Sequence, residues 1–364
     1  MRYVLFTNTP AHVHLYKHVV RRLLDGGHRV LVLAREYGCT LDLLEYYDLP
    51  YRSYGRCDTT KRSLIRNLPE QYATLIRETR RFDPDLIFGM GSYSAHAGLS
   101  SGTPTVLVLD SEPTGLDHRL STPFARTILT PHTFRKDLGE SHYRFTGYKE
   151  CAYLHPEVFS PSTNVRDRLG LGEEVPYAIV RFNAFGSHHD VHARGFTDEQ
   201  RYALIDHLSE HATVFVSDEG CGIDLEATEA RPFDLHPAEL HQALAGARLL
   251  VADSQTIVTE AALVGTPAIR SNSFVGDDDM GNFIELERNG LVRNLREFDA
   301  VLEAATAFAT DPALGERVGR RRLDYLGGMV NLTDLLVEVA EGGGEVEGVR
   351  GIRRDSPTPG CLVH

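Results

Sequence analysis

Short apolar runs alternate with amphipathic stretches along the first part of the chain. The runs are rich in Val, Ile, Leu and Phe, which is typical of strands buried on both faces of a parallel sheet. They comprise residues 2–7, 29–34, 86–90 and 105–109. Residues 15–24 and 61–82 carry apolar side chains at helical spacing, and glycines or an Asp-Pro pair end each stretch. This alternation predicts a parallel sheet with crossover helices.

The alternation begins again after residues 151–161, a segment with two prolines and no clear period, where we place the connection between two domains. Apolar runs then predict strands at residues 177–182, 213–217, 249–253 and 267–270. Periodic stretches predict helices at residues 198–208, 237–244 and 256–264. The pattern indicates a second doubly wound sheet.

The last part of the chain predicts helices and then a tail. Residues 296–310 and 312–339 have helical periodicity, whereas the glycine-rich and charged end is too polar to form a core. We therefore expect an N-terminal domain at 1–155, a C-terminal domain with terminal helices at 156–340, and a disordered tail at 341–364. The length of 364 residues favours two domains over one large barrel, because single cores usually stop growing at about 250–300 residues.

Composition indicates a globular protein, with 42% hydrophobic and 24% charged residues. No apolar run approaches the roughly 20 residues that span a bilayer, so we expect no transmembrane segment. The first residues lack the basic, apolar and small-residue order of a secretion signal. These features predict a cytoplasmic protein.

The formal charge of -13 repels phosphate backbones and anionic lipid, which argues against nucleic acid as a partner. Arginine supplies nearly all the positive charge. The lysines are Lys17, Lys61, Lys136 and Lys149. An acidic, lysine-poor surface suits high salt, although a GC-rich genome gives the same bias, so a halophilic source is one of two explanations. The five cysteines are scattered without a C-x-x-C pair, which predicts reduced structural thiols.

The segment VADSQTIVTEAALVGTPAIRSN, residues 251–272, combines strand, turn, helix and strand at the edge where α/β sheets bind ligands. Asp253 or Ser254 can cap the helix. The amides of Gln255 and Thr256 then point outward. A diphosphate can lie at this positive end of the helix dipole.

Glu260 lies one turn further along the same helix, where its carboxylate can accept both hydroxyl protons of a ribose. Gly265 lets the helix end tightly, and Pro267 begins the next strand without a donor. Arg270, in that strand, is a candidate for offsetting phosphate charge. The plainer alternative is ordinary helix capping with a solvated glutamate.

These residues carry a resemblance. The stretch DSQTIVTEAALVGTPAIR resembles the nucleotide-binding segment of non-hydrolysing UDP-N-acetylglucosamine 2-epimerases and, more loosely, that of GT-B glycosyltransferases. The matching positions are Asp253, Ser254, Ile257, Glu260, Ala261, Gly265, Pro267 and Arg270. The resemblance implies an α/β fold of the GT-B type, with two doubly wound Rossmann-like domains facing across a cleft. It implies Ser254 and its neighbours as diphosphate ligands and Glu260 as the ribose ligand.

The chain up to about Leu295 is still more similar to an uncharacterised archaeal and bacterial family of glycosyltransferase-like proteins of unknown function. The segments that carry this similarity are AHVHLYK, GYKECAYLHP, DSQTIVTEAALVGTPAIRSNSFVG and MGNFIELE. Together these segments are specific for the family. They do not indicate which reaction it catalyses, because one fold supports many reactions.

The segment VRFNAFGSHHDVHARG follows the first strand of the second domain and is similar to a strand-end loop of the epimerases. Arg181, Asn183 and Gly186 are candidates for binding the nucleotide sugar, and His188 for an acid, a base or a charge-assisted donor. The histidines of HHDVH can alternatively bind a metal, but adjacent histidines project differently and no carboxylate completes a known spacing. We expect no metal, and no cofactor besides the nucleotide sugar as substrate.

The segment VLVLDSEPTG places Asp110 and Glu112 just beyond a buried strand, about where the epimerases carry an acidic catalytic residue. Paired carboxylates can share protons, and each raises the pKa of the other. A helix cap or an ion pair with Arg119 is the alternative. His12, in the loop after the first strand, is a candidate base because this loop commonly faces the acceptor in GT-B enzymes; a surface or satisfied histidine is its plainer interpretation.

Three parts of the epimerase pattern are missing: the first-loop G-T-R-P-E, the paired glycines after Asp-Ser, and a later T-E-R-P-E, which SFVGDDDMGN replaces. The missing parts concern sugar and catalysis, whereas the surviving matches concern the nucleotide. We therefore expect a metal-independent GT-B glycosyltransferase with a UDP-sugar-like donor and a glycan or lipid-linked acceptor. The alternatives are a sugar-nucleotide 2-epimerase and a non-catalytic sugar-nucleotide-binding protein. The sequence indicates no particular oligomeric state.

Overall fold

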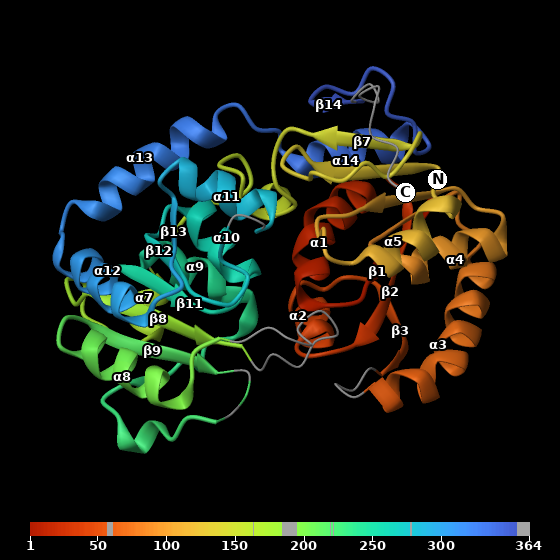
Figure 1. The fold of residues 1–364 in the computed structure, drawn as a ribbon. Helices are drawn as coiled ribbons and strands as arrows, with labels where there is room; N and C mark the ends of the chain where they lie inside the picture. The colour runs from red at the N-terminus through yellow and green to blue at the C-terminus, as the bar shows by residue number, and fades with distance from the viewer. Residues whose placement is uncertain are drawn as a thin grey trace. The chain divides into compact units, whose positions relative to one another are not determined.

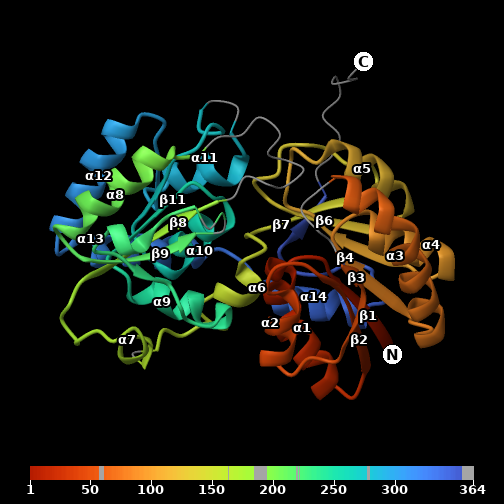
Figure 2. The same ribbon diagram turned by 90° about the horizontal axis from the view of Figure 1, so that it is seen from below.

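The computed structural model describes residues 1–56, 61–162, 164–183, 195–218, 220, 222–276 and 279–354. The chain divides into two compact units, each built on its own sheet (Figures 1 and 2). The first unit comprises Met1–Cys57, Ile65–Ala152 and Met329–His364, and the second comprises Asp58–Leu64 and Tyr153–Gly328. Within the described residues, no helix is both long enough and apolar enough to cross a bilayer.

The sheet of the first unit has the strand order β14-β7-β6-β5-β4-β1-β2-β3. Its strands are β1 Arg2–Thr7, β2 Arg29–Glu36, β3 Tyr51–Arg56, β4 Leu86–Gly89, β5 Thr105–Val108, β6 Thr127–Pro131, β7 His142–Phe145 and β14 Ile352–Arg353. Neighbouring strands are parallel except β7 and β14. Strand order reverses beside β1, which is the switch point of a doubly wound sheet.

Helices cover both faces of the first sheet. They are α1 Pro10–Asp25, α2 Thr40–Tyr46, α3 Lys61–Phe82, α4 Ser92–Ser101, α5 Gly115–Ser121, the 3-10 turn η1 Thr122–Phe124 and α14 Leu332–Glu341. The short helix α6 Cys151–Leu154 spans the boundary between the units, with Tyr153 in the second unit. Val4, Phe6 and Leu33 point into a core that α3 and α4 close, whereas α1 packs beside α14 (Figures 1 and 2). α1 begins earlier than the predicted residue 15, because Pro10 suits the first helical turn.

The sheet of the second unit has the order β10-β9-β8-β11-β12-β13, and all its pairs are parallel. Its strands are β8 Tyr177–Phe182, β9 Thr213–Asp218, β10 Arg231–Pro232, β11 Leu249–Ala252, β12 Ala268–Arg270 and β13 Val292–Asn294. Its helices are α7 Asn164–Arg168, α8 Asp198–Ser209, η2 Leu225–Ala227, η3 Pro237–Glu239, α9 Leu240–Gly246, α10 Thr256–Val264, α11 Gly281–Arg288, α12 Phe298–Thr310 and α13 Leu314–Leu326. The doubly wound α/β prediction is confirmed for both units.

The last helix does not follow the predicted domain boundary. We expected one helical stretch at 312–339 in the C-terminal domain, but it breaks at Gly327 into α13 and α14. α14 belongs to the first unit, where the Thr333 hydroxyl donates to the Ala152 carbonyl oxygen at 2.7 Å and Tyr3 donates to the Ala340 carbonyl oxygen at 3.1 Å. The chain therefore returns to the first unit at Met329, just before α14.

Residues 341–354 are packed, in contrast to the predicted disordered tail. The Thr127 hydroxyl donates to the Gly344 carbonyl oxygen at 2.7 Å, and β14 pairs with β7. Gly344 adopts a φ of +90°, and a β-carbon there would press on Leu86. The glycines that suggested disorder thus provide left-handed turns that let the backbone approach the sheet. Residues 355–364 of the predicted tail lie outside the described residues.

Candidate functional site

Helix α10 begins at the carboxyl edge of the second sheet without a side-chain cap. Its N-cap residue is Gln255, and neither Asp253 nor Ser254 caps it, so the capping prediction is wrong. The first turn contains no acidic residue, and the buried Ser254 hydroxyl has no hydrogen-bond partner among the described residues. Gln255 and Thr256 are partly exposed. The backbone amides that open α10 are therefore available to an anion.

Asp253 stabilises the backbone beside this helix. Its carboxylate is 1% exposed and accepts the Asn183 amide at 2.7 Å and the Phe196 amide at 3.3 Å. Burial raises the pKa of Asp253 to about 6, although both amide hydrogen bonds and Arg201 oppose the shift. Asp253 thus connects the end of β8 to the segment that leads into α8. Gly186 and His188, predicted between these two points, lie outside the described residues.

Glu260 lies inside the second unit, so the alternative of a solvated glutamate is wrong. Its side chain is 5% exposed. One oxygen, Oε1, accepts the Tyr153 hydroxyl at 2.8 Å and contacts His241 Nε2 at 2.9 Å. The Tyr153 and His241 rings lie 5.1 Å apart. The ribose-binding role stays a prediction.

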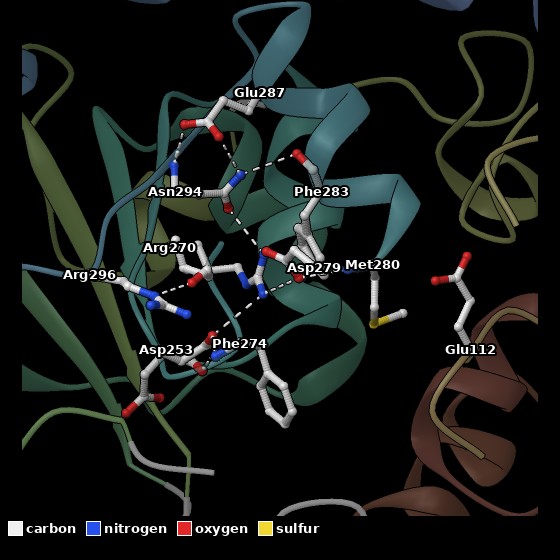
Figure 3. A network of polar contacts seen from close by, with 12 residues as sticks. Glu112, Asp253, Arg270, Phe274, Asp279, Met280, Phe283, Glu287, Asn294 and Arg296 are labelled. Atoms are coloured by element: carbon white, nitrogen blue, oxygen red, sulfur yellow. Dashed lines mark hydrogen bonds and ion pairs between the residues drawn. The ribbon is translucent and has the colours of Figure 1, made fainter. Parts of the chain in front are cut away.

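Arg270 is a structural cation, contrary to its predicted role at the phosphates. The guanidinium is fully buried and forms two hydrogen bonds with the Asp279 carboxylate, at 2.8 and 2.9 Å. It also donates to Asn294 at 3.1 Å and lies 3.6 Å from the Phe283 ring centre (Figure 3). These contacts join β12, α11 and β13. The guanidinium of Arg270 therefore interacts with groups inside the second unit and not with a ligand.

Arg181 is the remaining predicted phosphate ligand on this sheet. It is aligned with Ala252 of β11 on one side and with Ser217 of β9 on the other. Its side chain is partly exposed and donates to the Ser217 hydroxyl at 2.6 Å. Arg181 therefore lies on the strand beside β11, near the carboxyl end from which α10 follows. Asn183 lies two residues further on, and its backbone amide donates a hydrogen bond to the Asp253 carboxylate.

The two carboxylates predicted as a pair in the first unit have separate partners. Asp110 forms an ion pair with Lys149, which is 8% exposed and also lies 3.7 Å from Glu150. Glu112 accepts the Arg135 amide at 2.7 Å, and its other oxygen lies 3.5 Å from the Arg135 guanidinium. The partners are therefore Lys149 and Arg135, and not the Arg119 of the alternative prediction.

Nδ1 of His12 is an occupied hydrogen-bond acceptor in this arrangement. It accepts the Asn8 amide at 3.2 Å, so the neutral ring carries its proton on Nε2. Burial, followed by Lys149 and Arg35, lowers the pKa of His12 to about 3, although Asp110 opposes the shift. A general base works best when its pKa lies near the operating pH. The geometry thus argues against the predicted catalytic role of His12.

Sequence reasoning missed several residues at these positions. Lys149 and Tyr153 lie in GYKECAYLHP, a segment noted for its resemblance but given no chemical role. His241 lies in α9 and carried no signal. Within the described residues, no cluster of His, Cys, Asp and Glu is arranged to hold a metal ion. The histidines of HHDVH, the alternative metal ligands, lie outside those residues.

A family comparison agrees with this architecture. The sequence profile of a family described as proteins of unknown function, DUF354, matches residues 2–183, which is half of the chain. The chain belongs to the DUF354 family. No curated protein matches the sequence of this DUF354 member.

Solved structures show the fold of the DUF354 chain. The spinosyn forosaminyltransferase SpnP matches with a TM-score of 0.66 and 14% identity, over 95% of this chain and all of SpnP. A UDP-GlcNAc 2-epimerase from Neisseria meningitidis, bound to UDP-GlcNAc, has a TM-score of 0.66 and 12% identity, over 94% of this chain and all of the epimerase. MurG from Acinetobacter baumannii has a TM-score of 0.58 and 15% identity, with coverage of 94% and 100%. The DUF354 chain has the GT-B type of fold, with two Rossmann-like domains.

Proposed function

We propose that this DUF354 protein is a glycosyltransferase that uses a nucleoside diphosphate sugar as donor. The single observation that carries the proposal is the uncapped start of α10: its first turn contains no acidic residue, and the Ser254 hydroxyl has no hydrogen-bond partner among the described residues. A diphosphate is the anion that the GT-B fold suggests, since SpnP is a forosaminyltransferase and the Neisseria epimerase is bound to UDP-GlcNAc.

The proposed reaction moves a sugar from the diphosphate to an acceptor hydroxyl. The acceptor oxygen attacks the anomeric carbon, the bond from that carbon to the diphosphate oxygen breaks, and the diphosphate leaves with the electron pair. The amides of α10 and the Arg181 guanidinium stabilise the leaving charge. Asp110 takes the acceptor proton, and Lys149 holds the carboxylate in place.

Replacing Ser254 tests the diphosphate site directly. Ser254→Asp places a negative charge at the start of α10, which should stabilise the helix by about 0.3–1 kcal/mol and compete with a bound diphosphate. Ser254→Asn is the matched neutral control. We expect calorimetry to show UDP binding to the wild type and to Ser254→Asn, and at least about tenfold weaker binding to Ser254→Asp. UDP affinity that is equal in all three folded proteins would contradict the site.

The second candidate function is a sugar-nucleotide 2-epimerase, since the Neisseria enzyme with the same fold is a UDP-GlcNAc 2-epimerase. In that reaction Asp110 or Glu112 moves the proton at C2 while the diphosphate leaves and returns. Incubation with UDP-GlcNAc in heavy water separates the two functions. Deuterium in the recovered sugar nucleotide without an acceptor supports epimerisation, whereas UDP release that requires an acceptor supports transfer. UDP binding with neither outcome would leave the third function, a non-catalytic binding protein.

A further inference from the structure

Arg35 is a positioned cation near the carboxyl end of β2, on the first unit. Its Nε donates to the Asn8 carbonyl oxygen at 3.2 Å. Its guanidinium carbon lies 5.6 Å from the ring centre of Tyr37 and 5.8 Å from that of Tyr93. The Tyr54 hydroxyl fixes Asn8 in turn, through a 2.7 Å hydrogen bond to the side-chain oxygen. Contacts from β1, β3 and α4 therefore orient one partly exposed guanidinium.

Among the residues that the structure describes, no carboxylate forms an ion pair with this guanidinium. None of the ion pairs between described residues includes Arg35, whereas Arg52 and Arg126 of the same unit pair with Glu78 and Glu345. The adjacent carboxylate of Glu36 instead accepts the Ser53 hydroxyl at 2.8 Å. In a chain with a formal charge of -13, a fixed arginine without an acidic partner is a marked feature. Its terminal nitrogens form a planar fork that fits a carboxylate or phosphate.

Other groups that can donate hydrogen bonds belong to the same unit as Arg35. His12 is close enough for the positive charge of Arg35 to lower its pKa, and its Nε2 proton is a donor. Lys149 lowers the pKa of His12 in the same way, and it forms an ion pair with Asp110, the candidate base. These groups all follow the carboxyl ends of strands, the edge where α/β sheets bind ligands.

We propose that Arg35 binds the anionic group of the acceptor, and that the acceptor is a sugar that carries a carboxylate or a phosphate. The assignment to an acceptor rests on the proposed function, because Arg35 belongs to the unit that contains Asp110 and not to the unit that contains α10. The rings of Tyr37 and Tyr93 hold the guanidinium in one orientation, which reduces the entropy lost when an anion binds. A neutral sugar lacks the group that this cation recognises.

Ligand-observed NMR titration with D-glucuronate, glucose 6-phosphate, glucose and inorganic phosphate tests the inference. We expect both anionic sugars to bind the wild type more tightly than glucose does. Arg35→Gln should weaken their binding by about tenfold or more, because hydrogen bonds to charged groups are lost. The affinity of Arg35→Lys for the anionic sugars should lie between those of the wild type and Arg35→Gln, since lysine keeps the charge but lacks the planar fork of nitrogens.

Arg29→Gln is the matched control. Arg29 is an exposed arginine at the opposite end of β2, with its guanidinium carbon 5.5 Å from the Phe82 ring centre, so it tests the effect of one lost charge beside an aromatic ring. Arg29→Gln should leave the affinity for anionic sugars unchanged. An equal loss in both variants, or equal binding of glucose and glucuronate to the wild type, would overturn the inference. Binding of inorganic phosphate without either anionic sugar would also overturn it.

UDP titration of the same variants separates this inference from the proposed function. Arg35→Gln should bind UDP like the wild type, because α10 lies in the other unit. If UDP binds and the anionic sugars do not, the acceptor inference fails alone. If UDP does not bind but glucuronate still depends on Arg35, the anion site stands and the transferase proposal fails.

Discussion

Tyr153 and Glu260 meet inside the second unit although 107 residues separate them in sequence: the phenol donates to Oε1 of the carboxylate at 2.8 Å. His241 contacts the same oxygen, so two groups from α6 and α9 hold a carboxylate on α10. These contacts hold Glu260 in one position. A residue that binds ribose benefits from such rigidity, because a fixed acceptor loses less entropy when the sugar binds.

Removal of the phenol hydroxyl tests this arrangement. We expect Tyr153→Phe to lower the free energy of unfolding by about 0.5–1.5 kcal/mol, since it loses one buried hydrogen bond. Glu260→Ala should cost more, on the order of 2–5 kcal/mol, because it leaves the partners of the carboxylate unsatisfied. Urea unfolding measures both changes. Glu260→Gln, which keeps an acceptor oxygen, is the variant for UDP titration: weaker UDP binding with an intact fold supports the ribose role, and unchanged binding contradicts it.

The substitution of Phe for Tyr at position 16 should raise stability, whereas the same substitution at position 153 should lower it. The Tyr16 side chain is 1% exposed, and its hydroxyl has no hydrogen-bond partner among the described residues. Burial raises the pKa of this phenol. Tyr16→Phe removes a polar group that is desolvated without compensation, so we expect stability to rise by about 1 kcal/mol. A loss of stability as large as that of Tyr153→Phe would show that the Tyr16 hydroxyl is satisfied.

The sequence predicted the fold well where one segment determines its own structure. The apolar runs of β1, β8 and β11 gave buried parallel strands, and Gly265 ends α10 with a φ of +92°, as its position after the helix indicated. Helix α4, in contrast, lies between the predicted strands at 86–90 and 105–109, where the sequence did not indicate a helix. Its small residues are there for packing: a β-carbon on Gly98 would collide with Thr105 of the neighbouring strand.

The candidate site was harder to predict, because its chemistry depends on partners distant in sequence. The sequence around an arginine at a strand end does not indicate whether its side chain contacts a phosphate or a buried carboxylate. Only the folded structure shows that Arg270 pairs with Asp279. The cap of α10 was predicted from Asp253, but the amides of Asn183 and Phe196 use both of its oxygens. Local propensity therefore predicted the strands and the helix around the candidate site, but not the contacts of their side chains.

The buried pair of Arg270 and Asp279 should be strongly coupled. Arg270→Met leaves a buried carboxylate without its cation and should cost about 3–5 kcal/mol, whereas Arg270→Met with Asp279→Asn should cost clearly less than the sum of the single changes. The exposed pair of Arg320 and Glu316 is the control, and its loss should cost no more than about 0.5 kcal/mol. Urea unfolding of the double-mutant cycle measures the coupling; additive costs would contradict it. UDP affinity should not change while the protein is folded.

Asp253 should make stability depend on pH in an unusual direction. Its pKa rises from 3.8 to about 6 on folding, so between these values the folded protein binds a proton that the unfolded chain does not. This contribution to stability is complete below about pH 4 and is lost as the pH rises through about 6, with a total of about 3 kcal/mol. Asp253→Asn keeps a neutral side chain at every pH and should lack this dependence. Urea unfolding from pH 4 to pH 7.5 should therefore show wild type and Asp253→Asn most alike at pH 4, with the wild type increasingly the less stable toward pH 7. Two stability curves that run parallel over this range would show that the carboxylate is ionised throughout.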